Sequence, residues 1–189
     1  MTIPMMVKNT DGRVKPKPFS TTTRLDFEDV FQEYWPRLVG MLFRLTGDLD
    51  EAEDLALEAF WRLHKHPPKA DNSANLGGWL YRVAIRLGYN ALRSRKRRGN
   101  YEQTAGVQTI EAGDPLTPEA QVEQRLERER VRHVLARMQP RSAQVLVLRH
   151  SGLSYAEVAE ALGAAPGSVG TLLARAEKEF ERLYLSERR

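Results

Sequence analysis

The side chains best suited to binding a polyanion are concentrated in residues 75–98, whose sequence is NLGGWLYRVAIRLGYNALRSRKRR. Apolar residues recur there at three- and four-residue steps, which predicts a helix with one buried face. The other face carries Arg82, Arg86 and Asn90, and the helix runs into a cationic block: Arg93, Arg95, Lys96, Arg97 and Arg98. Because each neutralised phosphate releases counterions, this pattern indicates a nucleic-acid contact. For the basic run alone, a solvated helix end that complements the helix dipole is the alternative.

Acidic side chains dominate the region before this basic helix. They are Asp26, Glu28, Asp29, Glu33, Asp48, Asp50, Glu51, Glu53, Asp54 and Glu58. The net charge of the chain is only +4, so the distribution of charge is more informative than its sum. The acidic region indicates a cationic or mixed partner, and the basic helix a polyanion. Nothing in the sequence adds a pocket or a second catalytic group to these carboxylates, so no catalytic residue is assigned.

Length and composition bound the function further. A chain of 189 residues fits one domain or two small ones, and its 41% hydrophobic and 29% charged residues are typical of globular proteins. The absence of cysteine excludes disulfides and thiolate zinc sites. No apolar run approaches the roughly 20 residues that span a bilayer, and no secretory signal is evident, so we expect a cytoplasmic protein. His64 and His66 lack a third ligand, and no phosphate-binding glycine loop is present, so we expect neither metal nor cofactor.

Start and stop signals predict three helices in the first half of the chain. Asp26 is expected to cap the first helix, Pro36 to kink it and Gly47 to end it. Asp48 caps the second helix, and residues 64–74 form a loop before the basic helix. Short connections between the three helices predict a compact first domain.

The second half predicts a separate helical domain. Residues 99–116 lack periodicity, which predicts a linker, and Thr117-Pro118 is a strong helix start. Gln139-Pro140 ends the helix that starts there. Ser154 and Glu157 form a capping box before a short helix over 155–162. That helix, a turn containing Gly163 and a second helix over 166–185 match the helix-turn-helix pattern. The predicted fold is therefore all-α: two small helical domains joined by a flexible linker, the C-terminal one a helix-turn-helix.

The order and spacing of several motifs resemble bacterial RNA polymerase sigma factors of the extracytoplasmic-function (ECF) group. The motifs are LTGD at 45–48, EAEDL at 51–55, EAF at 58–60, WLYRVA at 79–84, QVLVLRH at 144–150 and GLSY at 152–155. The resemblance covers about residues 25–185. It implies a flexible N-terminal arm (1–24), sigma domain two (25–98), a linker (99–116) and sigma domain four (117–189).

The resemblance implies a transcription initiation factor that catalyses nothing itself. Such a factor binds core RNA polymerase at its clamp helices and flap, and directs it to promoters through −10 melting and −35 binding. The implied partners are core polymerase, promoter DNA and an anti-sigma factor, with no membrane insertion. Residues 71–76 match the loop that traps a flipped-out base in this family.

The resemblance also assigns residues to each contact. The core-binding residues are Glu53, Asp54, Leu55, Glu58 and Phe60. The −10 DNA-binding residues are Asn75, Trp79, Arg82, Arg86, Asn90, Arg93, Arg95, Lys96 and Arg97. The −35 DNA-binding residues are Ser168, Thr171, Leu172, Arg175 and Lys178.

Departures from the family pattern keep two alternatives open. The family has an Arg-Asn pair where this chain has Ile85 and Arg86, and its recognition helix carries donors or cations where this chain has, among others, Gly170 and Glu177. We expect Leu172 on the outward face, where it suits a hydrophobic partner or a thymine methyl. The alternatives are a standalone helix-turn-helix regulator with an N-terminal dimerisation domain, and a sigma-like module that binds protein without reading −35 DNA.

Overall fold

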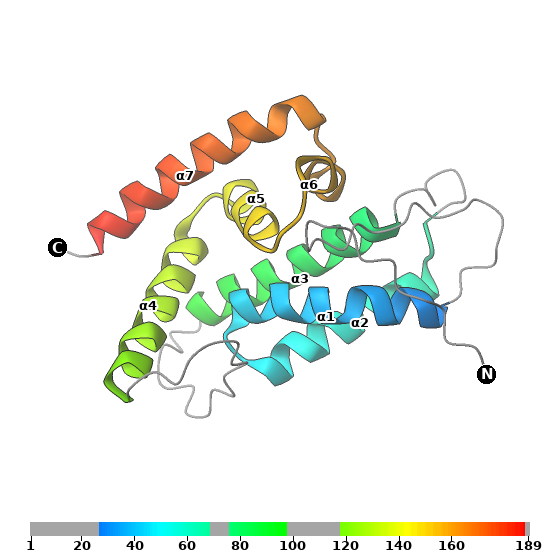
Figure 1. Cartoon of the computed structure of the whole chain (residues 1–189), viewed down its shortest axis with the longest axis horizontal. Coiled ribbons are helices and arrows are strands. Elements are labelled where there is room, and N and C mark those ends of the chain that lie inside the picture. The colour runs from blue at the N-terminus through cyan, green and yellow to red at the C-terminus, as the bar shows by residue number, and fades with distance from the viewer. Residues whose placement is uncertain (1–26, 69–75, 98–117, 188–189) are drawn as a thin grey trace, which may run out of the picture.

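The computed structural model describes residues 27–68, 76–97 and 118–187, which form helices and turns with no strand among them (Figure 1). The predicted all-α fold is therefore confirmed. The predicted arm (1–24), the cap at Asp26, Asn75 and the linker (99–116) lie outside the described residues. The helices are α1 (Phe27–Thr46), α2 (Leu49–Lys65), α3 (Leu76–Arg97), α4 (Pro118–Arg137), α5 (Pro140–His150), α6 (Tyr155–Leu162), the 3-10 turn η2 (Pro166–Ser168) and α7 (Val169–Ser186).

Helices α1, α2 and α3 pack on one another and are called here the N-terminal bundle. The second helix begins as predicted, because the Asp48 carboxylate accepts a hydrogen bond of 3.0 Å from the Glu51 backbone N–H. Gly47 ends α1 with a φ of +71°, a conformation that glycine adopts without strain. α1 continues through Pro36 as one helix. Side chains of all three helices fill the core, including Leu38, Leu42, Ala59, Phe60, Leu80 and Ala84.

A glycine lets α3 approach α1 closely. A Cβ atom at Gly88 would lie 2.7 Å from Leu42 Cδ2 and 2.8 Å from Leu45 Cδ1. Both leucines are fully buried, so neither can move aside cheaply. The close approach fixes the direction in which the polar face of α3 points.

Helices α4 to α7 are called here the C-terminal group. The predicted capping box at the start of α6 is confirmed: the Ser154 hydroxyl accepts from the Glu157 N–H, and the Glu157 carboxylate accepts from the Ser154 N–H. Gly163 ends α6 in the left-handed conformation. The chain then makes η2, where a helix was predicted from residue 166, before α7 begins. α6, its turn and α7 form the predicted helix-turn-helix.

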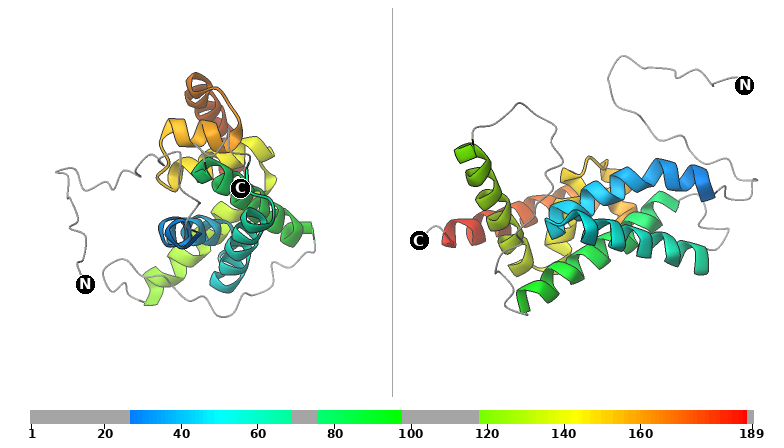
Figure 2. Two further views of the ribbon diagram at one scale, coloured as in Figure 1. Left: turned by 90° about the vertical axis from the view of Figure 1, so that its right-hand side faces the viewer. Right: turned by 90° about the horizontal axis from the view of Figure 1, so that it is seen from below.

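The N-terminal bundle and the C-terminal group pack against each other. α6, α5 and the end of α4 contact α3, and α5 and α4 also contact α1. Two further views show the C-terminal helices lying on the bundle (Figure 2). Buried side chains of both parts form one continuous apolar cluster. The polar face of α3 is thus partly covered by the chain itself.

Candidate nucleic-acid and protein interfaces

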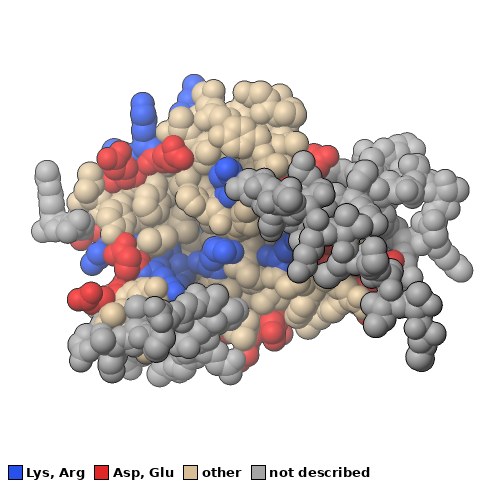
Figure 3. Space-filling model, in the orientation of Figure 1, with Lys and Arg blue, Asp and Glu red and all other residues tan. Residues whose placement is uncertain are grey.

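Polar side chains predicted to bind −10 DNA form a stripe along α3. Arg82, Arg86, Asn90 and Arg93 recur at helical spacing, so they share one face. Arg86, Asn90 and Arg93 are exposed, whereas Arg82 is half-buried. Lys and Arg side chains lie in a band across the middle of the molecular face in Figure 3. The stripe can contact phosphates and base edges through guanidinium and amide donors.

Arg82 is held by the C-terminal group. Its Nε donates to the Ala161 carbonyl at 3.1 Å, and its Nη2 donates to the Glu160 carbonyl. Both acceptors belong to the last turn of α6. In this structure the guanidinium is therefore engaged within the chain.

Arg95, which was also predicted to contact −10 DNA, is engaged within the chain as well. Arg95 donates to the Thr46 carbonyl at 2.6 Å and forms an ion pair with Glu51, so it ties α3 to the turn between α1 and α2. It lies off the exposed stripe because a helix turns about 100° per residue. In this structure the Arg95 guanidinium therefore has partners within the chain, and its contact with −10 DNA stays a prediction.

Two other residues of α3 that were predicted to contact −10 DNA, Lys96 and Trp79, are less exposed than the stripe. Lys96 is half-buried, and burial, with neighbouring Arg137 and Arg93, lowers the pKa of its ammonium group. Trp79 is also half-buried and packs against the core. The side chain of Arg97 lies outside the described residues. Lys96 and Trp79 therefore contribute less accessible surface than Arg86, Asn90 and Arg93.

The outward face of α2 combines carboxylates with large apolar side chains. Asp54, Leu57, Glu58 and Trp61 recur at three- and four-residue steps, and Leu57 and Trp61 are 51% and 54% exposed. Exposed apolar side chains that adjoin each other on a helix are typical of a protein contact. We name Asp54, Leu57, Glu58 and Trp61 the α2 docking face.

The structure corrects the predicted membership of this face. Phe60 is only 2% exposed and packs on Phe31, with ring centroids 4.8 Å apart, so it cannot contact a partner. Leu55 is half-buried against the core. Glu53 is half-buried, as is Glu58, which also forms an ion pair of 2.7 Å with Arg62. Leu57 and Trp61 were missed, although their four-residue spacing away from the apolar stripe of α2 was readable in the sequence.

Lys65 and His64 border Trp61. The Lys65 ammonium lies 4.5 Å from the centroid of the Trp61 ring, and the His64 ring stacks on it at 6.2 Å. These contacts limit the rotamers of the indole. A pre-ordered aromatic ring loses less side-chain entropy when a partner covers it.

Three of the residues predicted to contact −35 DNA lie together on one exposed face of α7. Thr171, Arg175 and Lys178 are exposed and recur at helical spacing, so they form one accessible face. The Ser168 hydroxyl donates to the Ala165 carbonyl at 2.7 Å and stabilises the turn before α7. Leu172 is half-buried against the core, so the expectation that it points outward is wrong.

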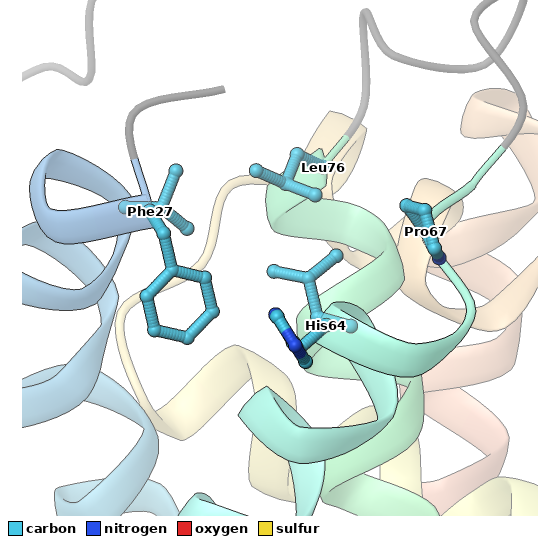
Figure 4. Close-up of a pocket in the computed structure, with 6 residues that line it drawn as sticks. Phe27, His64, Pro67 and Leu76 are labelled. Atoms are coloured by element: carbon cyan, nitrogen blue, oxygen red, sulfur yellow. The ribbon is translucent and has the colours of Figure 1, made fainter. Parts of the chain in front are cut away.

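An apolar pocket lies where α2 ends and α3 begins. It is lined by Phe27, Val30, Leu63, His64, Pro67 and Leu76 (Figure 4). The proposed base-trapping loop is represented here only by Leu76, because residues 71–75 lie outside the described residues. Among the residues that the structure describes, no three His, Cys, Asp or Glu side chains are grouped to hold a metal ion.

In the described part of the chain, the helices are too short or too polar to span a membrane.

Comparisons with known proteins identify two family regions in the chain. The family model for Sigma-70 region 2 matches residues 30–98, which include α2 and α3, and the model for Sigma-70 region 4 matches residues 128–180. The chain is 30% identical to the RNA polymerase sigma factor YlaC of Bacillus subtilis over 166 residues, covering 84% of this chain and 92% of that protein. It is 27% identical to the ECF RNA polymerase sigma factor SigW of the same organism, covering 82% of this chain and 87% of that protein.

Two solved structures share the fold. One is the sigma factor RpoE of Bartonella quintana in complex with the anti-sigma factor NepR, with a TM-score of 0.53, 22% identity, and coverage of 84% of this chain and 96% of that chain. The other is CnrH in complex with the cytosolic domain of CnrY, with a TM-score of 0.52, 20% identity, and coverage of 85% and 88%. By its two Sigma-70 regions and its relatives, this chain belongs to the ECF group of RNA polymerase sigma factors.

Proposed function

We propose that this chain is a transcription initiation factor that docks on core RNA polymerase through the α2 docking face and reads promoter DNA with α3 and α7. The observation that carries the proposal is that each helix presents an exposed stripe whose chemistry suits its partner. Matches to both Sigma-70 regions favour this function over a standalone regulator or a protein-binding module.

The α2 docking face has the composition of a protein interface. Leu57 and Trp61 supply apolar surface, and Asp54 and Glu58 supply negative charge at its edge. Tryptophan is enriched among residues that dominate binding energy. The partner surface should therefore be apolar at its centre and basic around it, as we propose for the clamp helices of the polymerase.

The stripe on α3 is the proposed −10 contact. Arg86 and Arg93 lie on either side of Asn90, so cations can hold the backbone while the amide reaches a base edge. Arg82 extends the same stripe by one turn once it is released from α6. Because single-stranded DNA is bound by charge and stacking together, the neighbouring half-buried Trp79 can add a stacking surface.

The stripe on α7 is the proposed −35 contact. Thr171, Arg175 and Lys178 can reach the major groove from the second helix of a helix-turn-helix. Only two of these side chains are cationic. If they neutralise about two phosphates, their contribution to the salt dependence is shallow: the logarithm of the binding constant should fall with the logarithm of the salt concentration with a slope near −2.

A second protein-binding surface is proposed on the C-terminal group. Val122 and Leu126 lie one turn apart on α4 and are 57% and 56% exposed. This apolar pair is our candidate contact for the polymerase flap. Because the similar RpoE structure is a complex with the anti-sigma factor NepR, and CnrH is bound to the cytosolic domain of CnrY, we also propose an anti-sigma partner for this chain.

A binding and transcription experiment tests the function. The purified chain is mixed with bacterial core RNA polymerase, and the affinity is compared for the wild type, Asp54→Arg and the control Glu181→Arg, which reverses an exposed charge on α7. We expect binding that Asp54→Arg weakens at least tenfold and Glu181→Arg leaves unchanged. Binding to duplex DNA with no binding to core polymerase would refute the proposal.

A further inference from the structure

The last turn of α3 has no apolar anchor. Leu92 is the last buried apolar residue of this helix, and the residues that follow it, up to the end of the helix at Arg97, are all polar or cationic. Like charges one turn apart repel one another, and helix ends fray where nothing holds them. The cations of this turn therefore need another contact if they are to keep fixed directions.

Arg95 supplies such a contact. It lies three residues after Leu92, so its side chain continues the buried side of α3. Its Nη1 donates to the Thr46 carbonyl at 2.6 Å, and its Nη2 forms an ion pair with Glu51. Thr46 is the last residue of α1, and Glu51 lies in the first turn of α2. One guanidinium thus joins the end of α3 to both of the other helices in the N-terminal bundle.

The Thr46 carbonyl requires a donor at this place. The last carbonyls of a helix have no partner within the helix and carry the negative end of its dipole. Thr46 is only 2% exposed, so water has little access to it. Arginine suits the position because its rigid fork of N–H donors can serve a carbonyl and a carboxylate at the same time.

The ion pair between Arg95 and Glu51 is sheltered from solvent. Their side chains are 28% and 31% exposed, and partial burial strengthens the attraction between charges that water would otherwise screen. The cap of α2 uses the backbone N–H of Glu51, which donates to the Asp48 carboxylate. Substituting the Glu51 side chain therefore breaks the ion pair and leaves this cap in place.

Arg93 points away from this contact. Two residues of helix correspond to a rotation of about 200°, so Arg93 and Arg95 lie on nearly opposite sides of α3. Arg93 is exposed and shares a face with Arg86 and Asn90. Because the two arginines belong to the same helical turn, anchoring Arg95 also sets the direction of Arg93.

We propose that Arg95 is a positioning residue for DNA binding: held by Thr46 and Glu51, it fixes the last turn of α3 so that Arg93 meets a phosphate of the −10 strand. A cation whose direction is set before binding loses less side-chain entropy when the phosphate arrives. The inference rests on the proposed function and adds Glu51, a residue of the polymerase-docking helix, to those that determine DNA affinity.

A positioning role and a direct DNA contact of Arg95 predict opposite effects of Glu51→Ala. If Arg95 positions Arg93, the substitution loosens the last turn and should weaken DNA binding about fivefold. If Arg95 itself binds a phosphate, the substitution releases it and removes a negative charge, so binding should be unchanged or tighter. Fluorescence anisotropy measures the affinity of the holoenzyme, assembled from core polymerase and the chain. The probe is a fork-junction DNA with an unpaired −10 strand, taken from a promoter that the holoenzyme selects.

A double-substitution cycle tests whether Glu51 acts through Arg93. Arg93→Ala should weaken binding about tenfold, and adding Glu51→Ala should cause no further loss, because the positioned cation is already gone. A role confined to overall stability would instead weaken binding equally in both backgrounds. Glu51→Gln should retain part of the affinity, since its amide oxygen can still accept from Arg95. Asp50→Ala is the matched control: it removes an exposed carboxylate from the same first turn of α2 and should leave binding unchanged.

Amide hydrogen exchange of the free chain tests the anchor without polymerase or DNA. Glu51→Ala should speed exchange several-fold in the last turn of α3, residues 94–97, and Asp50→Ala should not. Unchanged exchange in Glu51→Ala, DNA binding that is unchanged or tighter, or additive losses with Arg93→Ala would each overturn the proposal. A chain that does not bind core polymerase would refute the proposed function and the positioning role with it, whereas faster exchange in Glu51→Ala would still establish the anchor.

Discussion

Two adjacent aromatic residues of α2 should respond in opposite ways to truncation. Trp61 lies on the α2 docking face and is 54% exposed, whereas Phe60 lies in the core and is 2% exposed. Trp61→Ala should weaken the binding of core polymerase and leave the fold nearly unchanged. Phe60→Ala should lower the free energy of unfolding.

The magnitudes follow from the exposed and buried areas. A tryptophan side chain buries up to about 250 Å², so the exposed half of Trp61 offers roughly 120 Å² to a partner. At about 25 cal/mol per Å², covering this area contributes about 3 kcal/mol, which corresponds to roughly a hundredfold in Kd. Loss of the contacts with Lys65 and His64 should cost the fold about 1 kcal/mol or less. Truncating a buried phenylalanine such as Phe60 costs about 3–5 kcal/mol.

Two assays separate these effects. Fluorescence anisotropy of a labelled chain titrated with core polymerase reports Kd, and urea unfolding followed by circular dichroism reports stability. Trp61→Phe serves as the conservative variant and should recover part of the affinity, because an aromatic ring remains at the position. Wild-type affinity in Trp61→Ala would refute the assignment of the α2 docking face. Destabilisation of Trp61→Ala as severe as that of Phe60→Ala would refute the burial argument.

Three further outcomes are expected. Arg175→Ala with Lys178→Ala should abolish −35-dependent transcription and reduce the salt slope of promoter binding by about 2, as measured by filter binding across a salt series, without changing affinity for core polymerase. Gly88→Ala should destabilise the fold by about 1–3 kcal/mol in urea unfolding, because its Cβ would collide with buried leucines of α1; unchanged stability would contradict the close approach. Ser154→Ala should cost about 1 kcal/mol in the same assay by removing the capping box, whereas Ser154→Asp should retain most of the stability.

Local signals predicted the helices well. Asp48 and Ser154 were identified as caps from the sequence, and both side chains accept the expected backbone hydrogen bonds. Gln139-Pro140 separates α4 from α5 as predicted. These features depend on residues within one helical turn, so the sequence carries nearly all the information that determines them.

The predicted faces were less accurate than the predicted helices. Phe60 and Leu172 were placed on contact surfaces, yet Phe60 is buried and Leu172 is half-buried. Family motifs identify the segment that makes a contact, but a rotation of 100° per residue decides which side chains of that segment reach the surface. The spacing of Leu57 and Trp61 away from the apolar stripe of α2 is readable in the sequence, and the packed helix shows that both side chains are about half exposed.

The contact partner of Arg82 could not be predicted from local pattern at all. The donors of Arg82 and their acceptors in α6 are 78 and 79 residues apart in the chain, and periodicity says nothing about such pairs. The pattern does predict the kind of ligand, because a row of cationic side chains binds where negative potential is concentrated. Phosphates and the C-terminus of a helix both supply it, the latter more weakly. Because the end of α6 supplies such potential within the chain, Arg82 is engaged there although its residue type also suits a phosphate.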